Sequence, residues 1–135
     1  MAEPIRVLLV DDETLYVESL AKVLKRRGME VFTAPNGAQA IAFLPDHECD
    51  VIVLDLRMPG MDGIATLEEI RRHDTLTPVL ILTGHIDLER VTHALKGGVA
   101  EILLKPCPVD TLVSAIENAN ERKAIARDVA EKEEK

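Results

Sequence analysis

Aromatic residues are nearly absent from this sequence of 135 residues, which has no tryptophan, one tyrosine and two phenylalanines. Its apolar residues, 47% of the chain, are therefore mostly aliphatic. This composition predicts a core of valine, leucine, isoleucine and alanine, as is common in proteins that alternate strands and helices. The length fits one domain with a core of its own. Composition alone indicates no function.

A positive charge excess is also lacking. The chain has 24 acidic and 16 basic residues, for a formal net charge of −8, and no basic stripe. The average field would repel DNA or RNA. We therefore expect no direct binding to nucleic acid.

Long apolar runs and metal-binding cysteine spacings are missing too. No stretch approaches the roughly 20 residues of a membrane span. The amino terminus, MAEPIRVLLVDD, has too short an apolar run and no cleavage site for a signal peptide. Cys49 and Cys107 are far apart and fit no metal site. These absences predict a cytoplasmic protein with free thiols and no membrane contact.

What the sequence does have is a regular alternation of apolar runs and helical patterns. We expect strands at 5–10, 29–34, 50–54, 78–83 and 100–104, and helices at 14–27, 37–44, 64–73, 86–96 and from about 109. This alternation predicts an α/β fold, a doubly wound five-stranded parallel sheet with helices on both faces.

Polar residues follow four of these strands. Asp11 and Asp12 come after the first strand and Asp55 after the third. Thr83 ends the fourth strand, and Lys105 follows the fifth. Because the carboxyl ends of parallel strands share one edge of the sheet, where ligands bind, we expect one cluster of these groups.

The chemistry of such a cluster is restricted by charge. Three carboxylates repel one another and raise one another's pKa unless positive charge joins them. Lys105 supplies one charge, and Mg²⁺, which prefers oxygen ligands and phosphate, suits the remainder. A carboxylate left partly free beside a metal can attack phosphorus and form an aspartyl phosphate. Asp55, alone at its strand end, is the candidate.

Four segments together resemble the receiver domains of bacterial two-component response regulators, including chemotaxis receivers. They are VDDE, LDLRMPGMDG, LTG and LLKP, each at the end of a predicted strand. The resemblance covers about residues 4–120 and implies a receiver domain over 1–120 with the flavodoxin-like strand order 2-1-3-4-5. Residues 121–135 are then a charged helical extension or linker stub. A fraying, solvated end and a weak dimer seam both remain open for this tail.

The resemblance also implies a role for each residue of the cluster. Asp55 accepts a phosphoryl group from a phosphohistidine of a sensor histidine kinase or phosphotransfer protein. Asp12 and Asp55 bind Mg²⁺ directly with the backbone carbonyl of Arg57, and Asp11 acts largely through water. Catalysis is limited to self-phosphorylation of Asp55 and slow autodephosphorylation, so an enzyme in the usual sense is not expected.

Signalling is expected to follow from the new charge at Asp55. Thr83 hydrogen-bonds the phosphate, Lys105 pairs with it, and the Lys105–Pro106 bond is cis in such proteins. The helix at 86–96 and the fifth strand then present a changed surface to a downstream protein or output domain. A phosphorylation-dependent homodimer is left open.

Two positions depart from the family pattern, and two other functions compete. Ile102 and Cys107 stand where relatives usually carry aromatic residues, which predicts a weaker or differently routed conformational change. A Mg²⁺-dependent aspartyl-phosphate phosphatase would need an aspartate at Arg57. A flavodoxin would need a phosphate-binding loop in place of Asp11, Asp12 and Glu13. A receiver cut from a longer transcriptional regulator remains an alternative.

Overall fold

The computed structural model of the protein describes residues 3–58 and 60–133 and contains a five-stranded parallel sheet. The strands are β1 (Arg6–Val10), β2 (Glu30–Ala34), β3 (Val51–Leu54), β4 (Val79–Thr83) and β5 (Glu101–Leu104). Their order, β2-β1-β3-β4-β5, confirms the predicted topology. β1 pairs with β2 on one side and β3 on the other, so the chain changes direction across the sheet at β1.

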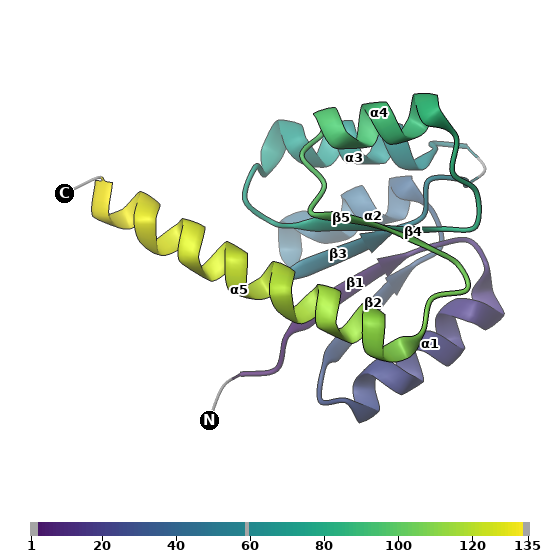
Figure 1. Cartoon of the computed structure of the whole chain (residues 1–135), viewed down its shortest axis with the longest axis horizontal. Helices are drawn as coiled ribbons and strands as arrows, with labels where there is room; N and C mark the ends of the chain where they lie inside the picture. The colour runs from purple at the N-terminus through teal and green to yellow at the C-terminus, as the bar shows by residue number, and fades with distance from the viewer. Residues whose placement is uncertain (1–2, 59, 134–135) are drawn as a thin grey trace.

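The helices form two layers around this sheet. α1 (Thr14–Arg26) and α5 (Val109–Glu133) cover one face, and α2 (Gly37–Phe43), α3 (Gly63–His73) and α4 (Leu88–Lys96) cover the other (Figure 1). The chain after α2 forms a 3-10 turn, Leu44–Asp46. α4 begins two residues later than predicted because the Asp87 carboxylate accepts the Arg90 N–H at 2.8 Å and caps the helix there.

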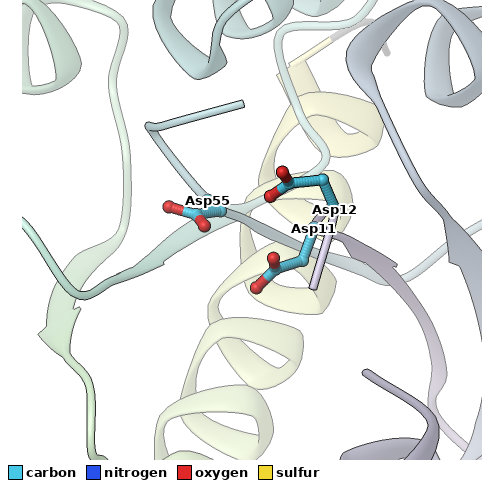
Figure 2. A group of neighbouring side chains, drawn as sticks. All are labelled: Asp11, Asp12 and Asp55. Atoms are coloured by element: carbon cyan, nitrogen blue, oxygen red, sulfur yellow. The ribbon is translucent and has the colours of Figure 1, made fainter. Parts of the chain in front are cut away.

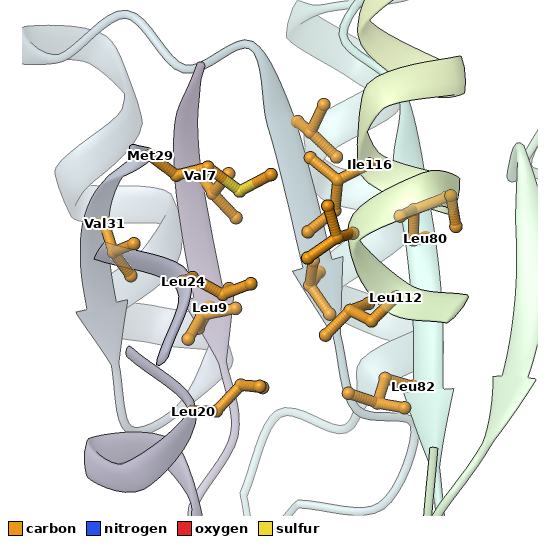
Figure 3. Packing of buried hydrophobic residues seen from close by; sticks show 14 of the residues in the cluster. Val7, Leu9, Leu20, Leu24, Met29, Val31, Leu80, Leu82, Leu112 and Ile116 are labelled. Carbon is orange, nitrogen blue, oxygen red and sulfur yellow. The ribbon is translucent and has the colours of Figure 1, made fainter. Parts of the chain in front are cut away.

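The core consists of two aliphatic clusters, one on each face of the sheet. Val7 and Leu9 of β1 pack with α1 and α5, whereas Leu8 and Val10 pack on the opposite face. Figure 3 shows the first cluster, with Leu112 and Ile116 of α5 among the strand residues. Each fully buried leucine or valine contributes about 1.5–3 kcal/mol. Burial on both faces explains why β1, β3 and β4 are almost continuously apolar, whereas β2 and β5 at the sheet edges carry exposed residues.

The last helix is much longer than the sheet needs. α5 continues to Glu133, and its final turns extend away from the rest of the domain (Figure 1). Residues 124–133 are all exposed, yet Lys123, just before them, is buried. Residues 134–135 of the predicted tail, and Pro59 of the predicted loop, lie outside the described residues. Among the described helices, none has the length and apolar character to cross a membrane.

Candidate functional site

Three carboxylates converge at the carboxyl edge of the sheet. Asp11 and Asp12 follow β1 and Asp55 follows β3, and these two strands are neighbours. One oxygen from each carboxylate lies within 4.8 Å of the others, and Figure 2 shows the three side chains grouped there. Asp11 and Asp55 are only 7% and 4% exposed, whereas Asp12 is exposed. The cluster predicted from the strand ends is therefore present, with one side open to solvent.

Lys105, directly after the end of β5, joins the cluster. Its Nζ lies 2.7 Å from Oδ2 of Asp11 and 3.3 Å from Oδ2 of Asp55, so the ammonium bridges two buried carboxylates. The Lys105 side chain is itself 11% exposed. The peptide bond to Pro106 is cis, as the resemblance implied. Carboxylates from two strand ends and an ammonium from a third thus meet within hydrogen-bond distance.

The electrostatics of the cluster leave it short of positive charge. Burial raises the pKa of Asp11, against the hydrogen bond from Lys105 and the Glu13 N–H, which lower it. Burial lowers the pKa of Lys105, but its hydrogen bond to Asp11 and the charge of Asp55 outweigh that effect and raise it. The lysine therefore stays protonated at neutral pH. One ammonium does not balance the charge of three carboxylates, so a further cation would stabilise the cluster.

Backbone groups hold two of the carboxylates in place. Oδ1 of Asp55 accepts the Arg57 N–H at 3.1 Å, and Oδ1 of Asp11 accepts the Glu13 N–H at 3.0 Å. Each aspartate thus bonds to the backbone two residues ahead, as aspartates do in turns. In both residues the other oxygen faces Lys105. The backbone therefore fixes one oxygen of each carboxylate and leaves the other for the Lys105 ammonium.

The start of α3 packs directly behind Asp55. A Cβ on Gly63 would lie 2.3 Å from the backbone oxygen of Asp55 and 2.5 Å from Cα of Leu56. The Gly63 N–H donates to the Leu56 carbonyl at 3.0 Å, and Asp62 caps the helix by accepting the Ala65 N–H at 2.9 Å. The missing side chain at residue 63 is therefore what allows helix and strand end to touch.

Thr83 and Arg57 lie at the same edge of the sheet. Among the residues that the structure describes, neither side chain forms a hydrogen bond or ion pair with the three carboxylates. Thr83 is fully buried, and its hydroxyl donates to the His85 carbonyl at a long 3.3 Å. Its own carbonyl accepts the Lys105 N–H at 2.8 Å, which ties the two strand ends together. Arg57 is exposed. The roles of the Thr83 hydroxyl and the Arg57 carbonyl remain predictions.

Two residues at the site were not predicted from the sequence. Nζ of Lys105 lies 4.7 Å from the centroid of the Tyr16 ring, a cation–π contact, and 3.6 Å from Oε1 of Glu13. Both residues come from the segment that follows Asp12. Tyr16 is the only tyrosine of the chain, and its place in the first turn of the helix after VDDE is the signal that could have identified it.

Comparisons with known proteins agree with this geometry. A model of the response regulator receiver domain matches residues 7–117. Over 124 residues the chain is 34% identical to the regulatory protein AtoC of Escherichia coli K12, covering 92% of this chain and 27% of AtoC. Over 113 residues it is 36% identical to the DNA-binding transcriptional regulator NtrC of the same strain, covering 84% of this chain and 24% of NtrC.

A solved response regulator receiver domain protein from Clostridium thermocellum is also similar. It superimposes with a TM-score of 0.85 and 33% identity, covering 90% of this chain and 98% of that one. The chain spans only about a quarter of the length of the curated relatives. With the family model matching most of its residues, the chain belongs to the response regulator receiver domain family of two-component systems.

Proposed function

We propose that this receiver domain is a phosphoacceptor in which Asp55 takes one phosphoryl group in a Mg²⁺-dependent step. The phosphoryl donor is a phosphohistidine of a sensor histidine kinase or phosphotransfer protein. We also propose that the protein is cytoplasmic, as expected from the sequence. One observation supports it above the others: oxygens of Asp11, Asp12 and Asp55 lie within 4.8 Å of one another beside Lys105.

The residues of the cluster fit a magnesium ion. Hard carboxylate oxygens with one exposed member suit a cation that keeps several waters. Asp12 and Asp55 would hold the ion with the carbonyl of Arg57, and Asp11 would act through water. When bound, the ion supplies charge neutralisation for the carboxylates and for the oxygens of the incoming phosphoryl group.

The chain's own groups account for orientation and charge in the transfer. An oxygen of Asp55 forms a bond to phosphorus while the phosphorus–nitrogen bond to the donor histidine breaks, and that imidazole keeps the electron pair and takes a proton from solvent. The Arg57 N–H fixes one Asp55 oxygen at 3.1 Å, so the carboxylate needs little reorientation. Lys105 already lies 3.3 Å from Asp55 and offsets the added negative charge.

The signal follows from that charge. Phosphorylation adds close to two negative charges and three acceptor oxygens. Thr83 exchanges its long hydrogen bond to His85 for one to the phosphate, and the segment leading to α4 moves with it. Ile102 of β5 is half-buried and packs against the aliphatic core on the face of the sheet that α2, α3 and α4 cover. Isoleucine has no aromatic ring that could swing inward. The change at α4 and β5 is therefore weaker, or differently routed, than in receivers with an aromatic residue there.

The test is labelling with acetyl phosphate and Mg²⁺, followed by intact mass. We expect one acid-stable, base-labile phosphoryl group per chain, lost when EDTA removes the metal and lost in Asp55→Asn. Asp46→Asn, at an exposed aspartate in the 3-10 turn, is the matched control and should label normally. Turnover of many equivalents of donor would indicate a phosphatase instead. Equal labelling of Asp55→Asn and wild type would refute the proposal.

We further propose that residues 1–120 form the receiver and that residues 121–135 connect it to an output domain of a longer transcriptional regulator. The coverage of only about a quarter of AtoC and NtrC and the unbroken run of α5 to Glu133 support this arrangement. Sizing by light scattering with and without beryllofluoride tests whether activation also produces a homodimer. A size unchanged by beryllofluoride would exclude that dimer for this chain.

A further inference from the structure

The Lys105 ammonium has an aromatic neighbour as well as its acidic partners. Its Nζ lies 4.7 Å from the centroid of the Tyr16 ring, a distance at which a cation and an aromatic face attract each other. Nζ also lies 2.7 Å from Oδ2 of Asp11, 3.3 Å from Oδ2 of Asp55 and 3.6 Å from Oε1 of Glu13. The ring therefore adds to the attraction that holds this ammonium without adding a negative charge.

The Tyr16 ring has a fixed place behind the charged groups. Tyr16 lies in the first turn of α1, is half-buried and packs against the aliphatic cluster on the face of the sheet that α1 and α5 cover. Val17 and Leu20 of the same helix are buried in that cluster. With Asp11 and Asp55, Tyr16 also lines a cavity of about 10 Å³, which has room for at most one water molecule. Little solvent therefore separates the ring from the two buried carboxylates.

The contact joins a cation to a neutral ring. Burial raises the pKa of Tyr16, against the Lys105 charge, which lowers it, so the hydroxyl keeps its proton at neutral pH. The Lys105 side chain is 11% exposed, and cation–π contacts are stronger where the cation has lost its water. Glu13, by contrast, has 59% of its side chain exposed. Tyr16 thus favours positions of the ammonium inside the cluster, and Glu13 favours positions nearer to solvent.

We propose that Tyr16 is a positioning residue that holds the Lys105 ammonium beside Asp55 before phosphoryl transfer. The proposal rests on the function proposed above for Asp55. A lysine side chain is flexible, and an ammonium that is already in place does not have to be ordered during the transfer. Without the ring, the ammonium is free to turn towards Glu13 and lies beside Asp55 in fewer molecules. The aromatic face carries this effect, and the Tyr16 hydroxyl is not required.

The first measurement needs neither metal nor phosphoryl donor. Protons above the face of an aromatic ring are shielded, so in EDTA the NMR signals of the Lys105 Hε protons should lie upfield of those of the other lysines. This displacement should persist in Tyr16→Phe and vanish in Tyr16→Leu. Leu20→Val, at a buried position one turn further along α1, is the matched control and should retain it. Identical Lys105 signals in wild type and Tyr16→Leu would overturn the proposal.

The second measurement is the rate of labelling with acetyl phosphate and Mg²⁺. Tyr16→Leu should label Asp55 about three- to tenfold more slowly than wild type, which is the size of a cation–π contact with a desolvated ammonium. Tyr16→Phe and Leu20→Val should label at the wild-type rate. In a Lys105→Met background, Tyr16→Leu should have no further effect, because the ring acts through that lysine.

Four kinetic results would overturn the proposal. They are a wild-type rate in Tyr16→Leu, slow labelling of Tyr16→Phe, equally slow labelling of Leu20→Val, and an undiminished effect of Tyr16→Leu in the absence of Lys105. A failure of the phosphoacceptor function looks different. If wild type takes up no phosphoryl group, or if Asp55→Asn labels as wild type does, the function proposed for Asp55 fails and the role of Tyr16 fails with it.

A second change at position 16 serves if Tyr16→Leu does not fold, which circular dichroism checks. Tyr16 is the only tyrosine of the chain, so 3-fluorotyrosine supplied during expression replaces this residue alone. Fluorine withdraws electrons from the ring and weakens its attraction for a cation, while the packing of the ring is kept. The fluorinated protein should label Asp55 more slowly than wild type, and an unchanged rate would overturn the proposal.

Discussion

Replacing Gly63 by alanine tests how tightly α3 is held against the strand end that carries Asp55. The added Cβ would lie 2.3 Å from the Asp55 backbone oxygen, against about 3.4 Å for an ordinary contact, so the helix start must move by about 1 Å. Backbone atoms cannot swing aside as a flexible side chain can. Overpacking of this kind costs about 1–3 kcal/mol, and the better helix propensity of alanine returns up to about 1 kcal/mol.

The expected net loss for Gly63→Ala is therefore about 1–2 kcal/mol in the free energy of unfolding, measured by urea denaturation. For a domain of this size that corresponds to a fall in Tm of roughly 4–8 °C. Gly84→Ala is the control, because nothing lies within 4 Å of its added Cβ and its φ is not positive. It should stay within about 0.5 kcal/mol of wild type. A Gly63→Ala protein as stable as the control would refute the close approach of α3 to Asp55.

Three further predictions concern charge and reactivity. In EDTA, Lys105→Met should destabilise the domain by roughly 3 kcal/mol, because the buried carboxylates lose their cation. Adding Mg²⁺ should then stabilise the variant more than it stabilises wild type. Equal stabilisation of the two proteins by Mg²⁺ would contradict a site shared by the lysine and the metal. Burial raises the pKa of Asp50, but the hydrogen bonds from Arg6 outweigh burial and lower that pKa below its ordinary value of 3.8. The ionised Asp50 therefore adds to the free energy of unfolding above pH 3.8, and this contribution is lost as the pH falls through and below that value. Urea denaturation from pH 6 to 3 should show a smaller loss in Asp50→Asn, and parallel curves would count against the pair. Burial raises the pKa of both thiols, that of Cys49 to about 11, and Cys49 is buried whereas Cys107 is half-buried. Maleimide should therefore modify Cys107 first at pH 8, and comparable rates in the two single Cys→Ser variants would contradict this.

The sheet and the cluster could be predicted because they depend on repeated local signals. Continuous apolar runs indicated strands covered on both faces, and residues at their carboxyl ends had to share one edge. Asp11, Asp55 and Lys105 meet for that reason, although Lys105 is 94 residues from Asp11. The bounds of α4 were less predictable, because capping by Asp87 competes with the apolar pattern that begins at Ile86.

Contacts between side chains from distant segments could not be predicted from the sequence. Lys123 lies in a charge-rich segment for which the sequence predicts exposure to solvent. Its hydrogen-bond partners are nevertheless the Cys49 carbonyl, 74 residues away, and the Thr77 hydroxyl, 46 residues away. Any residue can offer such a carbonyl, so the sequence carries no signal for it. Tyr16 differs, because its place in the first turn of the helix after VDDE is a signal in the sequence. Its contact with Lys105 still depends on how α1 lies beside the end of β5.

The most direct measurement of the central claim is identification of the phosphorylated side chain. After reaction with acetyl phosphate and Mg²⁺, borohydride reduces an aspartyl phosphate to homoserine, and peptide mass spectrometry locates it. The account predicts homoserine at position 55 alone. Homoserine at Asp11 or Asp12, or phosphate on a histidine or hydroxyl side chain, would contradict it.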